Sequence, residues 1–172
     1  MNRRGFLASS VAATLASVGG VSLPRWALAA APIEADLQAV TSTGGKVALS
    51  RADLQSLRDS LRGALMLPGE PGYDVSRRVQ NGSIDKHPAL IVQPSGVADV
   101  RTAVAFAKQH ELLLAVKCGG HSYSGKSTCD GGMQIDLARL RGVQVDAARK
   151  LAFVGGGSLL GDLDHEAMSL GL

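Results

Sequence analysis

The chain has 172 residues, of which 45% are hydrophobic and 19% are charged, proportions that suit one globular domain of ordinary size. The formal charge of +3 belongs entirely to the first 29 residues, because they hold three arginines and no acid, and 15 basic and 15 acidic side chains follow them. The balanced remainder has no lysine and arginine stripe, which excludes the electrostatic pattern of a nucleic-acid-binding protein.

The first 29 residues have the layout of an exported precursor. An arginine pair, Arg3 and Arg4, precedes Phe-Leu and a weakly apolar run, and small residues near Ala29 supply a cleavage site. An arginine pair, one spacer, Phe and Leu resemble a twin-arginine signal, which a transporter of folded proteins reads. We therefore expect residues 1–29 to be a twin-arginine-type signal peptide and the protein to be periplasmic or extracellular in a bacterium. An ordinary secretory signal and an uncleaved anchor are the alternatives, although Ser, Thr and Gly in the apolar run argue against a stable membrane span.

Residues 30–72 are predicted to form a helical lead-in segment. Ser50 and Asp53 resemble a capping box at a helix start, and Pro-Gly pairs at 68–69 and 71–72 should end that helix. Its core-facing side chains recur at helical spacing. They are Leu54, Leu57, Leu61 and Leu65.

A strand, a helix and a second strand are expected next. ALIV at 89–92 and LLLAVK at 112–117 predict two buried strands, and the residues between them predict a helix that ends near His110. The two strands should form a parallel pair with the helix as their crossover. The apolar face of the helix is expected at Val97, Val100, Val104 and Ala107.

Further strands follow at MQIDL, VQVD and LAFV, and three glycines at 155–157 then lead into a last helical pattern. Within MQIDL, Asp136 is expected to be a hydrogen-bonding residue at a strand end rather than an acid or base. No closing strand follows the last helix before Leu172, so the sequence indicates the front part of a larger protein.

The stretch GHSYSGKS, residues 120–127, lies at the carboxyl end of the second strand, where α/β sheets tend to bind ligands. It fits the phosphate-loop pattern, but that loop needs a helix that begins at the lysine, and TCDGGMQIDL cannot supply one. A serine-hydrolase elbow with Ser122 as nucleophile lacks the same helix. Its partners would have to be Asp162 or Asp164 with His165.

A third interpretation needs no helix. Glycines at 119, 120 and 125 let the backbone approach a ligand, and consecutive N–H groups can form an anion-binding nest. A diphosphate would suit such a nest, and His121 would offer a ring nitrogen to a cofactor's ring system.

Residues 78–172 resemble the FAD-linked oxidases of the vanillyl-alcohol-oxidase superfamily, which have a PCMH-type FAD-binding domain, and are closest to the berberine-bridge-enzyme-like group. The resemblance is carried by RVQNGSIDKHPALIVQPSGVADVRTAVAFAKQH, LLLAVKCGGHSYSGKSTCDGGMQIDLARLRGVQVD and FVGGGSLLGDLDHEAMSLGL, in the family's order and spacing. It implies an α+β fold with small mixed sheets and flanking helices. Residues 73–172 would be the amino-terminal part of that domain, incomplete at the carboxyl end.

The resemblance also implies a site. The loop from Lys117 to Gly125 would wrap the FAD diphosphate, and His121 matches the histidine that many members bond to the 8-methyl carbon of the flavin. A solvent-facing loop histidine is the alternative, because some relatives bind FAD without this bond. The implied cofactor-binding residues are Lys117, Cys118, Gly119, Gly120, His121, Ser122, Tyr123, Ser124, Gly125, Gly156, Gly157 and Ser158.

The two cysteines depart from the family pattern. Cys118 stands where many bacterial members have glycine, and neither Cys118 nor Cys129 matches the cysteine that forms a second flavin bond in some members. Two cysteines are also too few for a zinc site, and no metal is expected. The pair could form a disulfide in an oxidising compartment or stay reduced, and the sequence leaves both open.

The function implied is that of an FAD-dependent oxidoreductase, which oxidises an alcohol, sugar or similar small-molecule donor by hydride transfer to the flavin. The catalytic base is expected beyond Leu172, so the 172-residue chain alone should be inactive. The alternatives are a non-enzymatic flavin- or nucleotide-binding remnant and the serine hydrolase. The twin-arginine export machinery is the one expected protein partner, and the oligomeric state is open.

Overall fold

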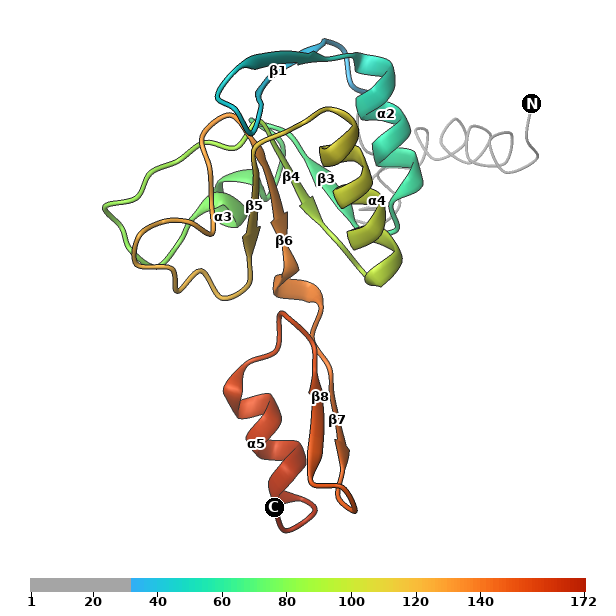
Figure 1. Cartoon of the computed structure of the whole chain (residues 1–172), viewed down its shortest axis with the longest axis vertical. Coiled ribbons are helices and arrows are strands. Elements are labelled where there is room, and N and C mark those ends of the chain that lie inside the picture. The colour runs from blue at the N-terminus through green and yellow to red at the C-terminus, as the bar shows by residue number, and fades with distance from the viewer. Residues whose placement is uncertain (1–31) are drawn as a thin grey trace, which may run out of the picture. The chain divides into compact units, whose positions relative to one another are not determined.

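A computed structural model describes residues 32–172, so the predicted signal peptide lies outside the described residues. Small sheets with flanking helices make up the described chain, which confirms the expected α+β class (Figure 1). In chain order the elements are β1 (Leu37–Val40), β2 (Lys46–Leu49), α2 (Arg51–Ser60), β3 (Ala64–Met66), α3 (Tyr73–Arg77), β4 (Leu90–Gln93), α4 (Val97–Gln109), β5 (Leu114–Lys117), β6 (Met133–Asp136), the 3₁₀ helix η2 (Leu137–Arg139), β7 (Val143–Asp146), β8 (Leu151–Val154) and α5 (Leu160–Met168).

The largest sheet has four strands in the order β3-β4-β6-β5. β4 and β5 both run parallel to β6, which lies between them, and β3 is antiparallel to β4. The predicted strand–helix–strand unit is therefore right in direction, but the prediction that its strands pair with each other is wrong. All four residues of β6 are buried, and a strand covered on both faces suits the interior of a parallel sheet.

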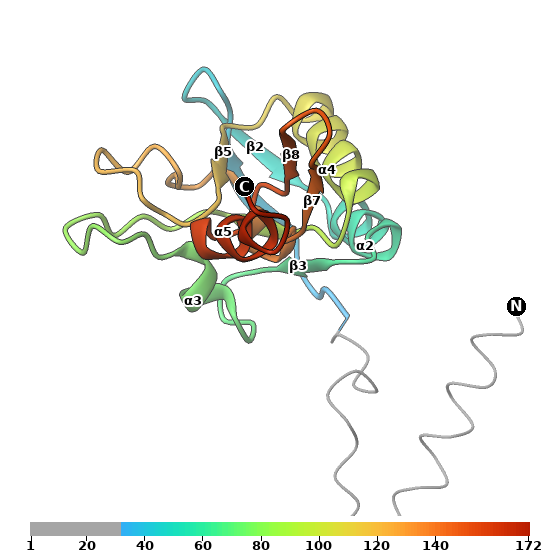
Figure 2. The same cartoon turned by 90° about the horizontal axis from the view of Figure 1, so that it is seen from below.

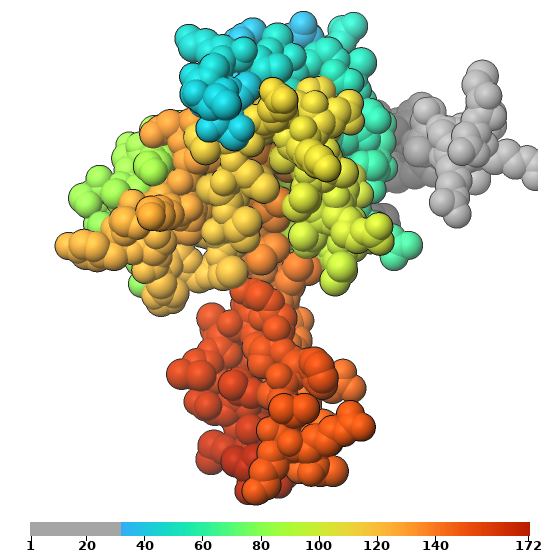
Figure 3. Space-filling view, viewed as in Figure 1, coloured from blue at the N-terminus to red at the C-terminus, as the bar shows by residue number. Residues whose placement is uncertain are grey.

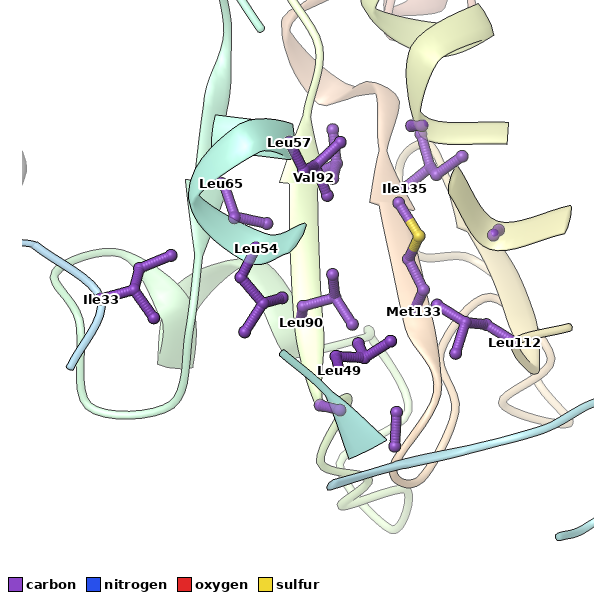
Figure 4. Packing of buried hydrophobic residues seen from close by; sticks show 14 residues of the cluster. Ile33, Leu49, Leu54, Leu57, Leu65, Leu90, Val92, Leu112, Met133 and Ile135 are labelled. Carbon is purple, nitrogen blue, oxygen red and sulfur yellow. The ribbon is translucent and has the colours of Figure 1, made fainter. Parts of the chain in front are cut away.

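Helices α2 and α4 lie together on one side of this sheet (Figure 2). Leu54 and Leu57 of α2 pack with Leu90 and Val92 of β4 and with Met133 of β6 in one core cluster (Figure 4). Burying a leucine side chain contributes about 1.5–3 kcal/mol relative to leaving it exposed. The apolar core between the sheet and helices α2 and α4 therefore contributes most of the packing that stabilises the sheet.

Helix α2 begins where the sequence predicts but ends earlier. Ser50 caps it by accepting the amide of Asp53 at 3.1 Å, and the last helical residue is Ser60. Leu65 lies in β3 instead of the helix, opposite Val92 of β4. The turn before β3 requires glycine, because a Cβ at Gly63 would lie 2.1 Å from the carbonyl oxygen of Gln93.

The predicted inward face of α4 is also wrong in part. Ala107 is buried as expected, but Val97 is 74% exposed and Val104 is 45% exposed. Asp99 and Ala103 point inward with Ala107 instead. Asp99 is drawn inward because its carboxylate accepts the amides of residues 62, 63 and 95 and the hydroxyl of Ser95.

The segment predicted as a helical lead-in contains three strands beside its one helix. β1 and β2 form an antiparallel hairpin whose turn places Gly44 at φ 87°, a conformation that glycine adopts without strain. The amide of Val40 donates to the carbonyl of Gly131 at 2.8 Å, so the hairpin is tied to the chain just before β6. The prediction of a mainly helical segment is therefore wrong.

The strands predicted at VQVD and LAFV and the helix after them are confirmed as β7, β8 and α5. β7 and β8 form an antiparallel pair that follows η2, and α5 contacts both strands (Figure 1). Apolar side chains of this part are exposed, among them Phe153 at 65% and Leu160 at 75%. Among residues 32–172 no helix has both the length and the apolar character needed to cross a membrane.

Candidate functional site

The chain from Cys118 to Gly132, between β5 and β6, consists of turns and bends without a helix. Gly120 and Gly125 have φ angles of 72° and 69°, in the left-handed region that favours glycine. The amide of Lys126, where a phosphate loop would begin its helix, instead donates to the Ser122 hydroxyl oxygen at 3.0 Å. The phosphate-loop interpretation is therefore excluded.

Backbone N–H groups along this loop have no protein acceptor. Within the described chain, the amides of residues 119–124 donate no hydrogen bond, and the next amide, of Gly125, donates to the carbonyl of Ser122 at 3.1 Å. A run of unpaired amides with a left-handed glycine in it is the composition of an anion-binding nest. The loop can therefore donate hydrogen bonds to the oxygens of a phosphate or diphosphate.

A second loop, residues 78–87, holds the first from the side. The amide of Gln80 donates to the carbonyl of Gly120 at 3.0 Å, and Asn81 Nδ2 donates to the carbonyl of Tyr123 at 2.8 Å. Lys86 Nζ donates to the carbonyl of Gly125 at 3.1 Å. In Figure 3 the two loops, coloured green and orange, lie against each other. Sequence reasoning gave this polar stretch no part in the site, because nothing local in it reveals the partner loop.

The second loop is anchored at its start by Arg77. Its guanidinium bonds Asp74 at 2.8 Å and also Asp85, and hydrogen bonding to Arg77 lowers the pKa of the Asp85 carboxyl below its ordinary value. Ile84 of the same loop packs on Gly125, where a Cβ would lie 2.7 Å from Ile84 Cγ2. Glycine at 125 thus serves both the backbone conformation and the contact between the loops.

His121 is exposed on the glycine-rich loop, and its ring lies over Gly119. A Cβ at position 119 would lie 2.7 Å from His121 Cδ2 and 2.9 Å from Nε2, so the observed ring position requires glycine there. The side-chain amide nitrogen of Gln80 lies 3.2 Å from His121 Nε2. The orientation of the imidazole is thus set by its packing on Gly119 and by the Gln80 amide next to Nε2.

A hollow of about 380 Å³ brings the two predicted site segments together. The glycine-rich loop supplies one wall and the segment that follows β8 supplies the other. Residues 120, 122–125 and 156 do not line the hollow; they lie along the same two segments. The lining residues are Cys118, Gly119, His121, Ala138, Arg141, Gly157, Ser158, Leu159 and Leu160.

The second wall packs closely on η2 and the residues after it. A Cβ at Gly157 would lie 2.1 Å from the carbonyl oxygen of Leu137, and one at Gly155 would lie 2.3 Å from that of Leu140. Ser158 Oγ accepts the amide of Gly142 at 3.0 Å and lies 3.1 Å from the same residue's carbonyl oxygen, to which it donates. These glycines are therefore needed for close packing, and the serine hydroxyl fixes the wall in place.

Lys117, predicted among the cofactor-binding residues, has its side chain inside the protein. Lys117 Nζ donates to the carbonyl of Ser76 at 2.7 Å and pairs with Asp136 Oδ2 at 3.3 Å. Asp136 also accepts the amide of Ala138 at 3.1 Å, which confirms its expected role as a hydrogen-bonding residue at the end of a strand. The ammonium group therefore lies beneath the loop rather than on its ligand-facing side.

The two cysteines are unpaired in the structure and differ in environment. Cys118 is exposed at the hollow, whereas Cys129 is buried and its thiol donates to the carbonyl of Met133 at 3.6 Å. Burial raises the pKa of the Cys129 thiol to about 11. The disulfide that the sequence left open is not formed here.

The serine-hydrolase alternative lacks its base. Among the described residues no hydrogen bond joins Ser122 to Asp162, Asp164 or His165; the Ser122 oxygen accepts the amide of Lys126 instead. Asp162 pairs with Arg141, whose side-chain hydrogen bonds lower the pKa of that carboxyl, and it accepts the amide of Leu159 at 2.7 Å. Over residues 32–172 no group of His, Cys, Asp and Glu side chains is arranged to hold a metal ion.

Known proteins resemble this chain in sequence and in fold. Residues 88–172 match the family described as FAD binding domain. The (R)-6-hydroxynicotine oxidase of Paenarthrobacter nicotinovorans is 34% identical over 113 residues, which are 66% of this chain and 25% of the relative. The structure of berberine-bridge-enzyme-like protein 1 of Physcomitrella patens matches with a TM-score of 0.61 at 29% identity, over 67% of this chain and 26% of that one. The grass pollen allergen Phl p 4, with glucose dehydrogenase activity, matches with a TM-score of 0.61 at 26% identity, over 68% and 26%.

The fold and the site therefore define an FAD-binding domain of the PCMH type. The chain belongs to the FAD-linked oxidoreductases of the vanillyl-alcohol-oxidase superfamily, among relatives that include berberine-bridge-enzyme-like proteins. It spans about a quarter of the length of the curated relatives that it matches.

Proposed function

We propose that this chain is the FAD-binding part of an oxidoreductase that oxidises an alcohol, sugar or similar donor. The observation that carries the proposal is the hollow between His121 and the segment at Gly157 and Ser158, because it joins the two stretches that the family resemblance assigns to FAD. The names of the relatives support a small organic donor, since one is a 6-hydroxynicotine oxidase and another has glucose dehydrogenase activity.

The residues present suit FAD. The unpaired amides of residues 119–124 would bind the diphosphate oxygens, which accept hydrogen bonds and carry negative charge. Glycine at 119 leaves the space that the His121 ring occupies, and Leu159 and Leu160 give the other wall of the hollow apolar side chains. FAD, when bound, supplies the hydride-accepting chemistry, and the protein supplies binding, orientation and electrostatics.

We also propose that His121 is the point of covalent attachment to the flavin. Its imidazole is exposed at the hollow, and a neutral imidazole is a nucleophile near physiological pH that needs no strong base. Attachment would hold the flavin ring at the loop after the diphosphate has bound. Neither cysteine is proposed as a second attachment point.

Flavin retention tests both proposals. The chain is produced with FAD, separated from free flavin, and run on a denaturing gel that is viewed under ultraviolet light. We expect a yellow protein whose flavin fluorescence survives denaturation in the parent and in His165→Ala, and is lost on the gel in His121→Ala. A colourless parent that binds no added FAD would overturn the proposed function, and a fluorescent His121→Ala band would overturn only the attachment.

A flavin-binding protein without turnover is the second candidate function. The observation that favours it is that no carboxylate lines the hollow, so none of its lining residues is an acidic general base. Anaerobic addition of donors to the loaded protein separates the two candidates. Bleaching of the flavin absorbance by any sugar or alcohol supports the oxidoreductase and would overturn the binding-protein candidate.

Export by the twin-arginine route is a further proposal, which rests on Arg3 and Arg4. A transporter that carries folded proteins suits a protein that binds its cofactor before leaving the cytoplasm. In a bacterial host, we expect the variant with Arg3→Lys and Arg4→Lys to stay in the cytoplasm while Arg25→Lys is exported. Equal export of the parent and both variants would contradict this route.

A further inference from the structure

A buried polar cluster lies beneath the glycine-rich loop. The Lys117 side chain is 10% exposed and the Asp136 side chain 2%, and their charged atoms are 3.3 Å apart. Gln134 Nε2 donates to the carbonyl of Ser76 at 2.7 Å, the same oxygen that accepts from Lys117 Nζ. The cluster therefore joins α3, β5 and β6.

Each member of the ion pair lies next to an element that forms or supports one wall of the hollow. Lys117 is the last residue of β5, and Cys118, which follows it, lines the hollow. Asp136 is the last residue of β6 and caps η2 through the amide of Ala138, which also lines the hollow. η2 in turn supports the second wall, because the carbonyl of Leu137 lies against Gly157.

The register of β5 depends on few contacts. β5 is an edge strand that pairs only with β6 in this sheet, over four residue pairs of which Lys117 with Asp136 is the last. A buried ion pair often adds little net stability compared with a packed apolar pair, because both charges lose their hydration. Removing one partner is costly, because the other charge is then buried without a partner. The role that remains for such a pair is to fix the ends of the two strands relative to each other.

We propose that the Lys117–Asp136 pair is a positioning device that sets the two walls of the hollow relative to each other. The inference deepens the proposed FAD site: Lys117 serves it from inside the protein and does not act as the counter-charge of the diphosphate. The two residues should therefore act as one unit, and either substitution should loosen both walls.

The test is a double-mutant cycle with Lys117→Met, Asp136→Asn and the double variant, read by amide hydrogen exchange in the full chain. Lys117→Arg keeps the charge, and the exposed pair of Arg149 and Asp146, changed to Met and Asn, is the matched control. Because the amides of residues 119–124 donate no hydrogen bond, the first wall is read at β5, which carries it, and the second wall at the bonded amides of Gly155, Gly157 and Ser158. We expect each single core variant to speed exchange at both places by about tenfold or more, and the double variant to be no worse than either single. Lys117→Arg and the control pair should leave the protection of β5 and of the second wall unchanged.

Three outcomes would overturn the proposal: additive effects, loosening of one wall alone, or an equal loss of protection in every strand of the sheet. An equal loss in every strand would assign the pair a general structural role. FAD titration is the second readout, with affinity expected to fall about tenfold in each single variant and not further in the double. A Lys117→Met loss that Asp136→Asn does not share would indicate direct contact with the diphosphate. If the parent binds no FAD, the proposed function fails, and the exchange data still decide the positioning role.

Discussion

The side-chain amide nitrogen of Gln80 lies 3.2 Å from Nε2 of His121, across 41 positions of sequence. The contact belongs to a set in which the loop of residues 78–87 also binds the carbonyls of Gly120 and Tyr123. Because those carbonyls are occupied, the backbone amides of the glycine-rich loop are the groups that remain for a ligand. The second loop thus determines both the orientation of the imidazole and the polarity of the site.

Removing the Gln80 amide should slow flavin attachment without unfolding the chain. A neutral hydrogen bond contributes about 0.5–1.5 kcal/mol, so Gln80→Ala should lower the attachment rate by roughly threefold to tenfold. The rate is measured from the flavin fluorescence that survives denaturation at increasing times after FAD is added. Gln144→Ala, at an exposed glutamine of β7, is the control and should match the parent. An unchanged rate in Gln80→Ala would show that the loop alone positions the ring.

A methyl group at position 119 should separate flavin attachment from stability. In Gly119→Ala the new Cβ would lie 2.7 Å from His121 Cδ2, and the exposed ring can move aside, so the free energy of unfolding should change by less than about 1 kcal/mol. The displaced imidazole should nevertheless lose most of its covalent flavin. Urea unfolding and gel fluorescence measure the two effects. Gly82→Ala, where no atom lies within 4 Å of the new methyl, should change neither.

The two thiols should react at very different rates. Cys118 is exposed at the hollow, whereas Cys129 is buried with its pKa raised to about 11, so little thiolate is present at pH 8. We expect iodoacetamide to modify Cys118 at least about a hundredfold faster than Cys129 in the native chain, and both at similar rates in urea. Peptide mass spectrometry assigns the sites, and bound FAD should protect Cys118. Equal native reactivity would contradict the burial of Cys129.

Local signals allowed much of the fold to be predicted from sequence. Ser50 and Asp53 predicted the start of α2, because capping involves neighbouring residues. The missing helix after Lys126 followed from the glycine pair at 131–132, which breaks helices. The site loop could be recognised for the same reason, since its glycines and histidine are contiguous.

Features that depend on distant partners could not be predicted. The rotation of α4 is set by Asp99, whose donors include the amides of Arg62 and Gly63, more than thirty positions earlier, so the valines alone indicated the wrong face. The insertion of β6 between β4 and β5 likewise leaves no local mark. Lys117 was assigned to the ligand because the family resemblance begins the diphosphate loop there, whereas its side chain pairs with Asp136 on another strand.

The Asp99 carboxylate should make the stability of the chain depend on pH. Burial opposes its ionised form, but hydrogen bonds from Ser95, Arg62 and Gly63 outweigh burial and lower its pKa. A carboxyl whose pKa is lower in the folded chain stabilises the fold above the unfolded pKa of about 3.9 and loses this effect as the pH falls through the folded pKa.

Replacing Asp99 by Asn should therefore reduce the free energy of unfolding by about 2 kcal/mol at pH 7, because buried amide donors lose their charged acceptor. The difference from the parent should narrow below about pH 4, where the parent's carboxylate becomes protonated. Urea unfolding followed by circular dichroism at pH 7, 5 and 3 measures this difference, and Asp164→Asn on the exposed surface of α5 is the control. A difference that stays constant or grows toward pH 3 would show that the charge of Asp99 does not hold the turn before β3 to the start of α4.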